Sequence, residues 1–352
     1  MIGAPLKRAT LMVALVTLLS TEVRVEAQGD KDELRAEEVR IASEPGVTLA
    51  GTLERPRAAT QDRLPVVVVV AGTGPWTRGG FWAIRRRLLE NGIAALEYDK
   101  RGQGGSTGTF EDTIPVMERD VAAAVAFLRT RPDVDSKRIA LLGLSQGAVA
   151  APAVASRDPA IAAVVALSGP VGPRGELFLG IMRANLAANG RSAASIDEVL
   201  LATRRWMEAR SRLAGDEETG RLRRELATAF VTQTGFTSEQ ADGFVKTLDN
   251  PVVLSMDKAD PARGMAAVHA PILVIYGSRD AVIAPALHNP AARKALSGNP
   301  DATVVTVPGL THELARLGPD GKVIAAPRTD PMNPGVVDMI GRWLRARLLP
   351  SG

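Results

Sequence analysis

A serine stands between two glycines in the segment Gly143-Leu144-Ser145-Gln146-Gly147, which fits the pattern G-x-S-x-G. An apolar run at 139–142 precedes this segment, and a stretch of small residues at 148–151 follows it. A strand, a tight turn and a helix in this order are the context of a nucleophile elbow, which lifts the serine hydroxyl clear of a sheet. The flanking glycines remove side chains that would collide at such a turn. The sequence therefore predicts Ser145 as the nucleophile of covalent catalysis.

A second segment, 104–108, fits the same pattern around Ser106. It lies in a polar, glycine-rich stretch after Tyr98-Asp99-Lys100-Arg101, with no strand leading directly into it and no helical pattern after it. Because the pattern alone carries a risk of false matches, the surrounding elements have to distinguish the two segments. We interpret Ser106 as a loop serine.

A serine hydroxyl needs a base that removes its proton, and the base needs an acid that orients it. Around a nucleophile elbow the chain order is serine, acid, histidine. Of the three histidines, His312 follows the last predicted strand, and sheets of this kind place ligands at the carboxyl ends of their strands. We expect His312 to be the base. His288, in a loop past the expected acid, is the alternative base, and His269 is interpreted as a surface or packing residue.

The acid is expected directly after the strand that precedes the histidine loop. Asp280 has this position, at the end of Tyr276-Gly277-Ser278-Arg279-Asp280. An aspartate that caps a turn is the structural alternative. Asp257 and Asp260 are competing acids, but both precede the strand at 272–276 instead of following it.

Attack on an acyl carbon creates an oxyanion, which needs backbone N–H donors that are already in place. The residue after the nucleophile, Gln146, is expected to supply one donor. Thr73 is expected to supply the other, from the loop Gly72-Thr73-Gly74-Pro75. This loop could instead cradle a phosphate, but no lysine follows at the spacing of a phosphate-binding loop. No cluster of metal ligands is visible in the sequence, and we expect neither a metal nor another cofactor.

Hydrophobic patterning predicts an α/β fold with a mostly parallel, doubly wound sheet that positions these residues. An antiparallel hairpin at 38–42 and 48–53 begins the fold, and the β-branched run at 66–71 is typical of a strand buried on both faces. Further strands are expected at 94–98, 139–142, 161–167, 272–276 and 303–307. Helices are expected at 81–90, 116–129, after Ser145 and at 336–348.

The strand pattern disappears between about 170 and 264, where helical patterns with many charges take its place. Such a stretch is too long for a loop within a compact domain. We expect a helical lid inserted between two strands of the sheet. Its charged faces are interpreted as solvated helix surface, and the alternative is that its apolar residues wall a substrate pocket.

The amino-terminal residues 1–27 are predicted to be a secretory signal peptide. Lys7 and Arg8 precede a short apolar run at 11–19, and Val25-Glu26-Ala27 offers small residues at a cleavage site. A retained membrane anchor is the alternative, although the apolar run is short for a span. The chain has no cysteine, which excludes a lipoprotein anchor and disulfides. The mature domain, 28–352, is expected to be periplasmic or secreted, without a stable membrane anchor.

The formal net charge of +4 does not indicate a nucleic-acid partner. Acidic residues are interleaved with the 43 basic ones, and no basic stripe with aromatic residues is present. We interpret the basic composition as a coding bias, and expect a small molecule as the partner.

Five segments of the chain resemble those of α/β-hydrolase esterases, in particular the bacterial carboxylesterases of the EstD-like, serine aminopeptidase-like type. They are residues 71–80, 98–102, 143–147, 277–280 and 309–312. The resemblance covers about residue 38 to the carboxyl terminus and is weakest in the lid. Two departures are Ala71, where relatives often carry histidine or serine, and the absence of the amino-terminal extension of the EstD-like esterases.

This resemblance implies the α/β-hydrolase fold and a triad of Ser145, Asp280 and His312. It also implies an oxyanion hole of Thr73 with Gln146, no cofactor, and short-chain carboxylic esters as substrates. A peptidase, an acyltransferase or a thioesterase with the same triad is the alternative. A peptidase would need a lid carboxylate for the substrate amine, such as Glu208 or Glu217. A non-catalytic binding protein on the same fold is a remoter alternative.

Overall fold

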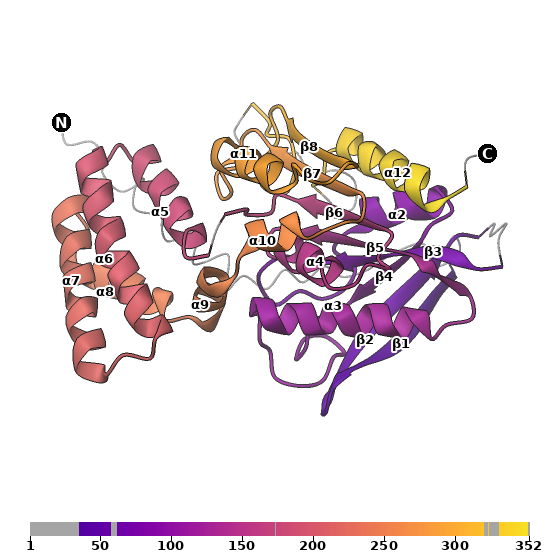
Figure 1. The fold of residues 1–352 in the computed structure, drawn as a ribbon, viewed down its shortest axis with the longest axis horizontal. Helices are drawn as coiled ribbons and strands as arrows, with labels where there is room; N and C mark the ends of the chain where they lie inside the picture. Colours follow the sequence, from indigo (N-terminus) through magenta and orange to yellow (C-terminus); the bar gives the residue numbers. More distant parts are fainter. Residues whose placement is uncertain (1–34, 58–61, 173, 320–322, 324–330, 351–352) are drawn as a thin grey trace. The chain divides into compact units, whose positions relative to one another are not determined.

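The computed structural model describes residues 35–57, 62–172, 174–319, 323 and 331–350. The predicted leader, 1–27, lies outside these residues. Two compact units make up the described chain (Figure 1). The sheet unit ends at Val171 and resumes at Pro261, and the helical unit is Gly172–Asp260. Among the described residues, no helix combines the length and the apolar character that a membrane span requires.

A sheet of eight strands forms the centre of the sheet unit, in the order β1-β2-β4-β3-β5-β6-β7-β8. The strands are β1 (Arg35–Glu44), β2 (Val47–Arg55), β3 (Leu64–Val70), β4 (Ala94–Tyr98), β5 (Val134–Leu144), β6 (Ala163–Leu167), β7 (Ile272–Gly277) and β8 (Ala302–Val307). β1 pairs with β2 and β2 with β4 in antiparallel register, and every later pair is parallel. The predicted fold class, a mostly parallel sheet that begins with an antiparallel hairpin, is confirmed.

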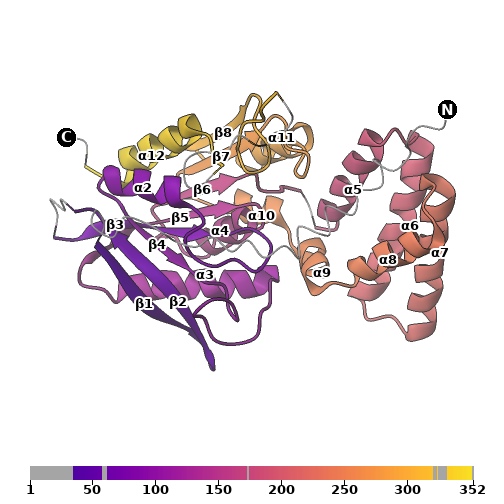
Figure 2. The same cartoon turned by 180° about the vertical axis from the view of Figure 1, so that it is seen from behind.

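Helices cover both faces of this sheet. α2 (Trp82–Glu90) and α12 (Pro334–Leu348) pack together on one face, with an apolar core that includes Leu88 and Leu344. α3 (Ile114–Arg129), α4 (Gly147–Ala155), α10 (Pro261–Ala266) and α11 (Pro285–Ala295) contact one another in sequence on the other face (Figures 1 and 2). All seven residues of β3 are buried, as expected for a β-branched strand between two helical layers.

α11 corrects one expectation, because it contains His288, which the sequence placed in a loop. Pro285 and Pro290 interrupt the sequence pattern by which a helix would be predicted at this position. Pro285 occupies the first turn, where its missing N–H costs no helical hydrogen bond, and Pro290 is accommodated inside the helix.

The helical unit has its own apolar core, in which Phe178, Trp206, Phe230 and Phe244 are the largest side chains. Its helices are α5 (Leu177–Ala188), α6 (Ala193–Ser211), α7 (Asp216–Thr234), α8 (Ser238–Leu248) and α9 (Pro251–Lys258). Local capping structures mark two of the helix ends. Thr237 and Gln240 form a reciprocal capping box at α8, and Gly235 ends α7 in the left-handed conformation.

Candidate active site

Ser145 lies on the tight turn between β5 and α4 with a φ of 55°, a conformation that is uncommon for residues other than glycine. Its N–H donates a hydrogen bond of 2.8 Å to the Leu167 carbonyl at the end of β6, which anchors the turn to the sheet. A Cβ at Gly143 would overlap the backbone of Gly147, and a Cβ at Gly147 would overlap the Val70 carbonyl oxygen. Only glycine therefore fits on either side of this serine.

Asp280 and His312 lie in the loops after β7 and β8, and their side chains are hydrogen-bonded. The Nδ1 atom of His312 lies 2.8 Å from Oδ2 of Asp280, whose side chain is completely buried. The other carboxylate oxygen accepts the amides of Val282 and Ile283 at 2.8 and 2.7 Å. Because the carboxylate holds Nδ1 as the donor, Nε2 is the ring nitrogen left to accept a proton.

Close backbone contacts join the two loops that carry this pair. The Arg279 amide donates to the Leu310 carbonyl at 2.8 Å, and the Gly309 amide donates to the Ser278 hydroxyl at 2.8 Å. A Cβ at Gly277 would overlap the carbonyl oxygens of Leu310 and Thr311. The position of His312 therefore depends on glycine at the end of β7.

Ser145 and His312 are not hydrogen-bonded to each other in the described part of the chain. Both follow parallel strands of one sheet, at the carboxyl edge where such sheets bind ligands. Hydrogen bonds between a nucleophile and its base are often long in the absence of substrate and shorten when the substrate binds.

The loop after β3 approaches the predicted nucleophile closely. A Cβ at Gly72 would lie 3.3 Å from the Ser145 Cβ and 3.9 Å from its Oγ. Trp76 fixes the shape of this loop, because its indole N–H donates to the Thr73 carbonyl at 2.9 Å. Within the described residues, the amides of Thr73 and Gln146 have no hydrogen-bond acceptor in the protein. Two unused N–H donors near a serine are what an oxyanion hole requires.

Residues 67–326 match the sequence model of a family described as the alpha/beta hydrolase family. The chain belongs to the alpha/beta hydrolase family. The predicted resemblance to α/β-hydrolase esterases is confirmed at the level of this family.

Two relatives of this α/β-hydrolase family member match part of the chain. The chain is 34% identical over 134 residues to the thiohydrolase apmlB of Arthrinium phaeospermum, a match that covers 38% of this chain and 42% of that protein. It is 30% identical over 111 residues to the quorum-quenching protein AidA of Acinetobacter baumannii, which covers 31% of this chain and 36% of that protein. Both matches span less than half of the relative's length.

Solved structures are similar over nearly the whole hydrolase. The esterase Pf2001 of Pyrococcus furiosus superposes with a TM-score of 0.57 at 18% identity, covering 92% of this chain and 98% of that one. The protein PA2218 of Pseudomonas aeruginosa superposes with a TM-score of 0.55 at 18% identity, covering 92% and 95%. At these identities the similarity is one of fold.

The alternative serine of the hydrolase, Ser106, has a structural contact on each side of its hydroxyl. The hydroxyl donates to the Asp99 carbonyl at 2.7 Å and accepts the Ala50 amide at 2.9 Å, so it ties the loop after β4 to β2. Both partners are backbone atoms, and the loop leads into no strand or helix at this point.

The alternative base and the alternative acids lie elsewhere. His288 is buried in α11, with Nδ1 3.0 Å from the Val171 carbonyl oxygen, and burial lowers its pKa. His269 is exposed in the turn before β7, and Asp257 belongs to α9 of the helical unit. Burial raises the pKa of Asp257, which the cations of Arg174 and Arg204 partly offset. Glu208 and Glu217 are both exposed on the helical unit.

Lys100 and Asp112 are two site residues that the sequence did not reveal. They form a buried ion pair directly behind the loop after β3. Burial lowers the pKa of Lys100 and raises that of Asp112. The sequence feature that could have indicated this pair is Asp99-Lys100-Arg101, three charged residues at the end of a fully buried strand. Charges at such a position are costly to bury unless they are paired.

Proposed function

We propose that the hydrolase cleaves carboxylic esters through an acyl-enzyme on Ser145, with His312 as base and Asp280 as the orienting acid. One observation carries the proposal: the hydrogen-bonded Asp280–His312 pair and the strained Ser145 turn follow strands of the same sheet edge. This combination of an activated base and a presented hydroxyl is the requirement for serine nucleophilic catalysis.

In the proposed reaction, the Ser145 oxygen attacks the ester carbonyl carbon while His312 Nε2 takes the hydroxyl proton. Asp280 stabilises the resulting imidazolium through Nδ1. The amides of Thr73 and Gln146 donate to the oxyanion of the tetrahedral intermediate. The intermediate expels the alcohol, which takes the proton from His312. Water then attacks the acyl-enzyme by the same steps, which releases the acid and restores Ser145.

A fluorophosphonate probe tests the assignment of the nucleophile. We expect the probe to modify Ser145 alone, as located by peptide mass spectrometry, and Ser145→Ala to lower turnover of a p-nitrophenyl ester by about 10⁴–10⁶-fold while the protein stays folded. Ser106→Ala is the matched control, because it removes a hydroxyl in the second G-x-S-x-G segment, and it should retain most activity. Labelling of Ser106 in place of Ser145 would refute the proposal.

A thioester is the second candidate substrate, because apmlB, to which part of the chain is similar, is described as a thiohydrolase. An acyl-enzyme on Ser145 can form from either class, since both present an electrophilic acyl carbon. An oxygen ester and a thioester of the same acyl group should be compared by kcat/KM. A preference of tenfold or more for the thioester would favour the second candidate, and cleavage of aminoacyl-anilides instead would identify a peptidase.

A further inference from the structure

Two buried side chains hold the loop after β3 from behind. The Lys100 ammonium donates to the Gly72 carbonyl and forms an ion pair with the Asp112 carboxylate. The other carboxylate oxygen of Asp112 accepts the Gly74 amide at 2.6 Å. Thr73, the proposed oxyanion donor, therefore lies between two residues whose backbones are fixed by one ion pair.

Asp112 also reaches the second proposed donor. Its backbone carbonyl accepts the side-chain amide of Gln146 at 2.6 Å, and Gln146 is completely buried. The backbone N–H of Lys100 donates to the Trp76 carbonyl at 3.1 Å, at the far end of the loop. The pair thus contacts the segment of each oxyanion donor.

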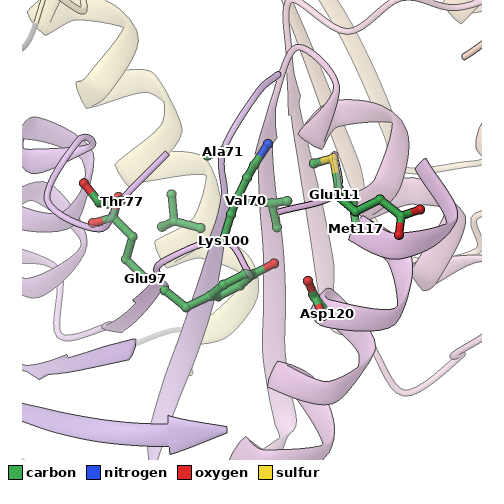
Figure 3. A pocket seen from close by; sticks show the side chains of 10 residues that line it. Val70, Ala71, Thr77, Glu97, Lys100, Glu111, Met117 and Asp120 are labelled. Atoms are coloured by element: carbon green, nitrogen blue, oxygen red, sulfur yellow. The ribbon is translucent and has the colours of Figure 1, made fainter. Parts of the chain in front are cut away.

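Asp112 is the carboxylate that forms an ion pair with Lys100 in the described part of the chain, whereas Asp120 acts on the Lys100 charge without such a contact. Lys100 lines a cavity of about 10 Å³, roughly one water molecule in size, together with Glu97, Glu111 and Asp120. Figure 3 shows the Lys100 side chain with its amino group directed away from Asp120. Asp120 is instead bound by the Arg101 guanidinium through both carboxylate oxygens.

We infer that Lys100 and Asp112 are positioning residues that hold the Thr73 and Gln146 amides in register for the oxyanion. The inference rests on the proposed function. A buried ion pair is weak evidence for stability, because neutral residues of similar size often serve as well. Its contribution is here geometric: it restrains a loop whose two glycines, Gly72 and Gly74, would otherwise allow many conformations.

The double variant Lys100→Met/Asp112→Asn tests this role, because it removes both charges together and leaves an acceptor for the Gly74 amide. We expect kcat for a p-nitrophenyl ester to fall about 10²-fold, the effect of losing one oxyanion donor, with KM nearly unchanged. The rate of Ser145 phosphonylation should fall by a similar factor. Rates are given per active site, counted by titration, and thermal unfolding checks that the variant is folded.

The matched control is Arg101→Met/Asp120→Asn, which removes the neighbouring buried pair, whose side chains make no hydrogen bond to residues 72–76 within the described chain. Its kcat per titrated site should stay within about threefold of wild type.

Wild-type kcat and labelling in the Lys100/Asp112 variant would overturn the inference. Should that variant not fold, Asp112→Asn alone decides: a fall in kcat without a change in KM supports the inference, and an unchanged kcat overturns it. Failure of the probe to label Ser145 in the wild type would refute the proposed function instead.

Discussion

At the scale of single residues, Ser145 keeps a backbone conformation that costs about 1–2 kcal/mol for a residue with a Cβ. The hydrogen bond to Leu167 and the close packing of Gly143 and Gly147 compensate for this cost. The same glycines prevent any relaxation of the turn that would need space for a side chain. The hydroxyl is therefore presented by the backbone, while Asp280 and His312 are aligned through their side chains.

Replacing Asp280 by asparagine should lower kcat by about 10⁴-fold, because the amide no longer fixes the proton on Nδ1 of His312. The fold should persist, since the asparagine oxygen can still accept the amides of Val282 and Ile283. Steady-state kinetics and thermal unfolding measure the two effects. Asp257→Asn, the rival acid, should keep most activity, and equal inactivation of both variants would contradict the assignment of Asp280.

Candidate site residues that directly follow a strand could be predicted from the sequence, and their catalytic roles stay predictions. Ser145, Asp280 and His312 were predicted from chain order, and the structure joins Asp280 to His312 by a hydrogen bond. Lys100 and Asp112 were not predicted, because their contacts with Gly72 and Gly74 form only when the loop after β4 meets the loop after β3.

At the scale of elements, strands with continuous apolar patterns were predicted most accurately, and residues 272–276 and 303–307 fall within β7 and β8. β5 is longer than expected and begins at Val134, because Val134 pairs with Leu64 ahead of the apolar run. α11 was missed because its prolines interrupt the local pattern. Packing of α11 against β7, β8 and α10 decides its conformation, and this information is not local in the sequence.

α11 also gives the protein a pH-dependent stability through His288. Burial, the largest effect, lowers the pKa of His288 below its ordinary value of 6.5, although Asp280 and the Val171 backbone act in the opposite direction. The unfolded chain therefore binds a proton at a higher pH than the folded chain. The free energy of unfolding should fall as the pH decreases from about 6.5 towards the lower folded pKa.

Chemical denaturation at several pH values measures this effect. His288→Asn should flatten the slope in that window, because asparagine can contact Val171 without titrating. His269→Asn, at the exposed histidine, should retain the wild-type slope. An unchanged slope in His288→Asn would show that another group is responsible.

Replacing either of two glycines in the helical unit by alanine should change its free energy of unfolding, in opposite directions for the two positions. A Cβ at Gly243, on the exposed face of α8, meets nothing within 4 Å, so Gly243→Ala should stabilise the unit by about 0.5–1 kcal/mol. Gly235 has a φ of 70° at the end of α7, and Gly235→Ala should destabilise it by about 1–2 kcal/mol. Urea unfolding of the full chain measures both. Stabilisation by Gly235→Ala would contradict the capping geometry.

At the scale of the whole molecule, we propose that the hydrolase is exported and that its mature chain begins near Gln28. This proposal rests on the basic residues Lys7 and Arg8, the apolar run at 11–19 and the small residue Ala27. Mass spectrometry of the protein from its native cells should find the new amino terminus in the periplasmic or secreted fraction. Ala27→Leu, which places a bulky residue at the cleavage site, should retain the leader. An intact amino terminus in the wild type would refute the proposal.

The separate core of the helical unit bears on how this hydrolase can diversify. Trp206, Phe230 and Phe244 belong to the helical unit's own apolar cluster, whereas the proposed triad and oxyanion residues all belong to the sheet unit. The residues on either side of the insertion are held by the sheet unit itself, Val171 through His288 and Pro261 through α10, which packs on α4. The insertion therefore has a core of its own between two ends that the sheet unit holds. We expect that Gly172–Asp260 can be exchanged for another helical segment with the Asp280–His312 hydrogen bond retained.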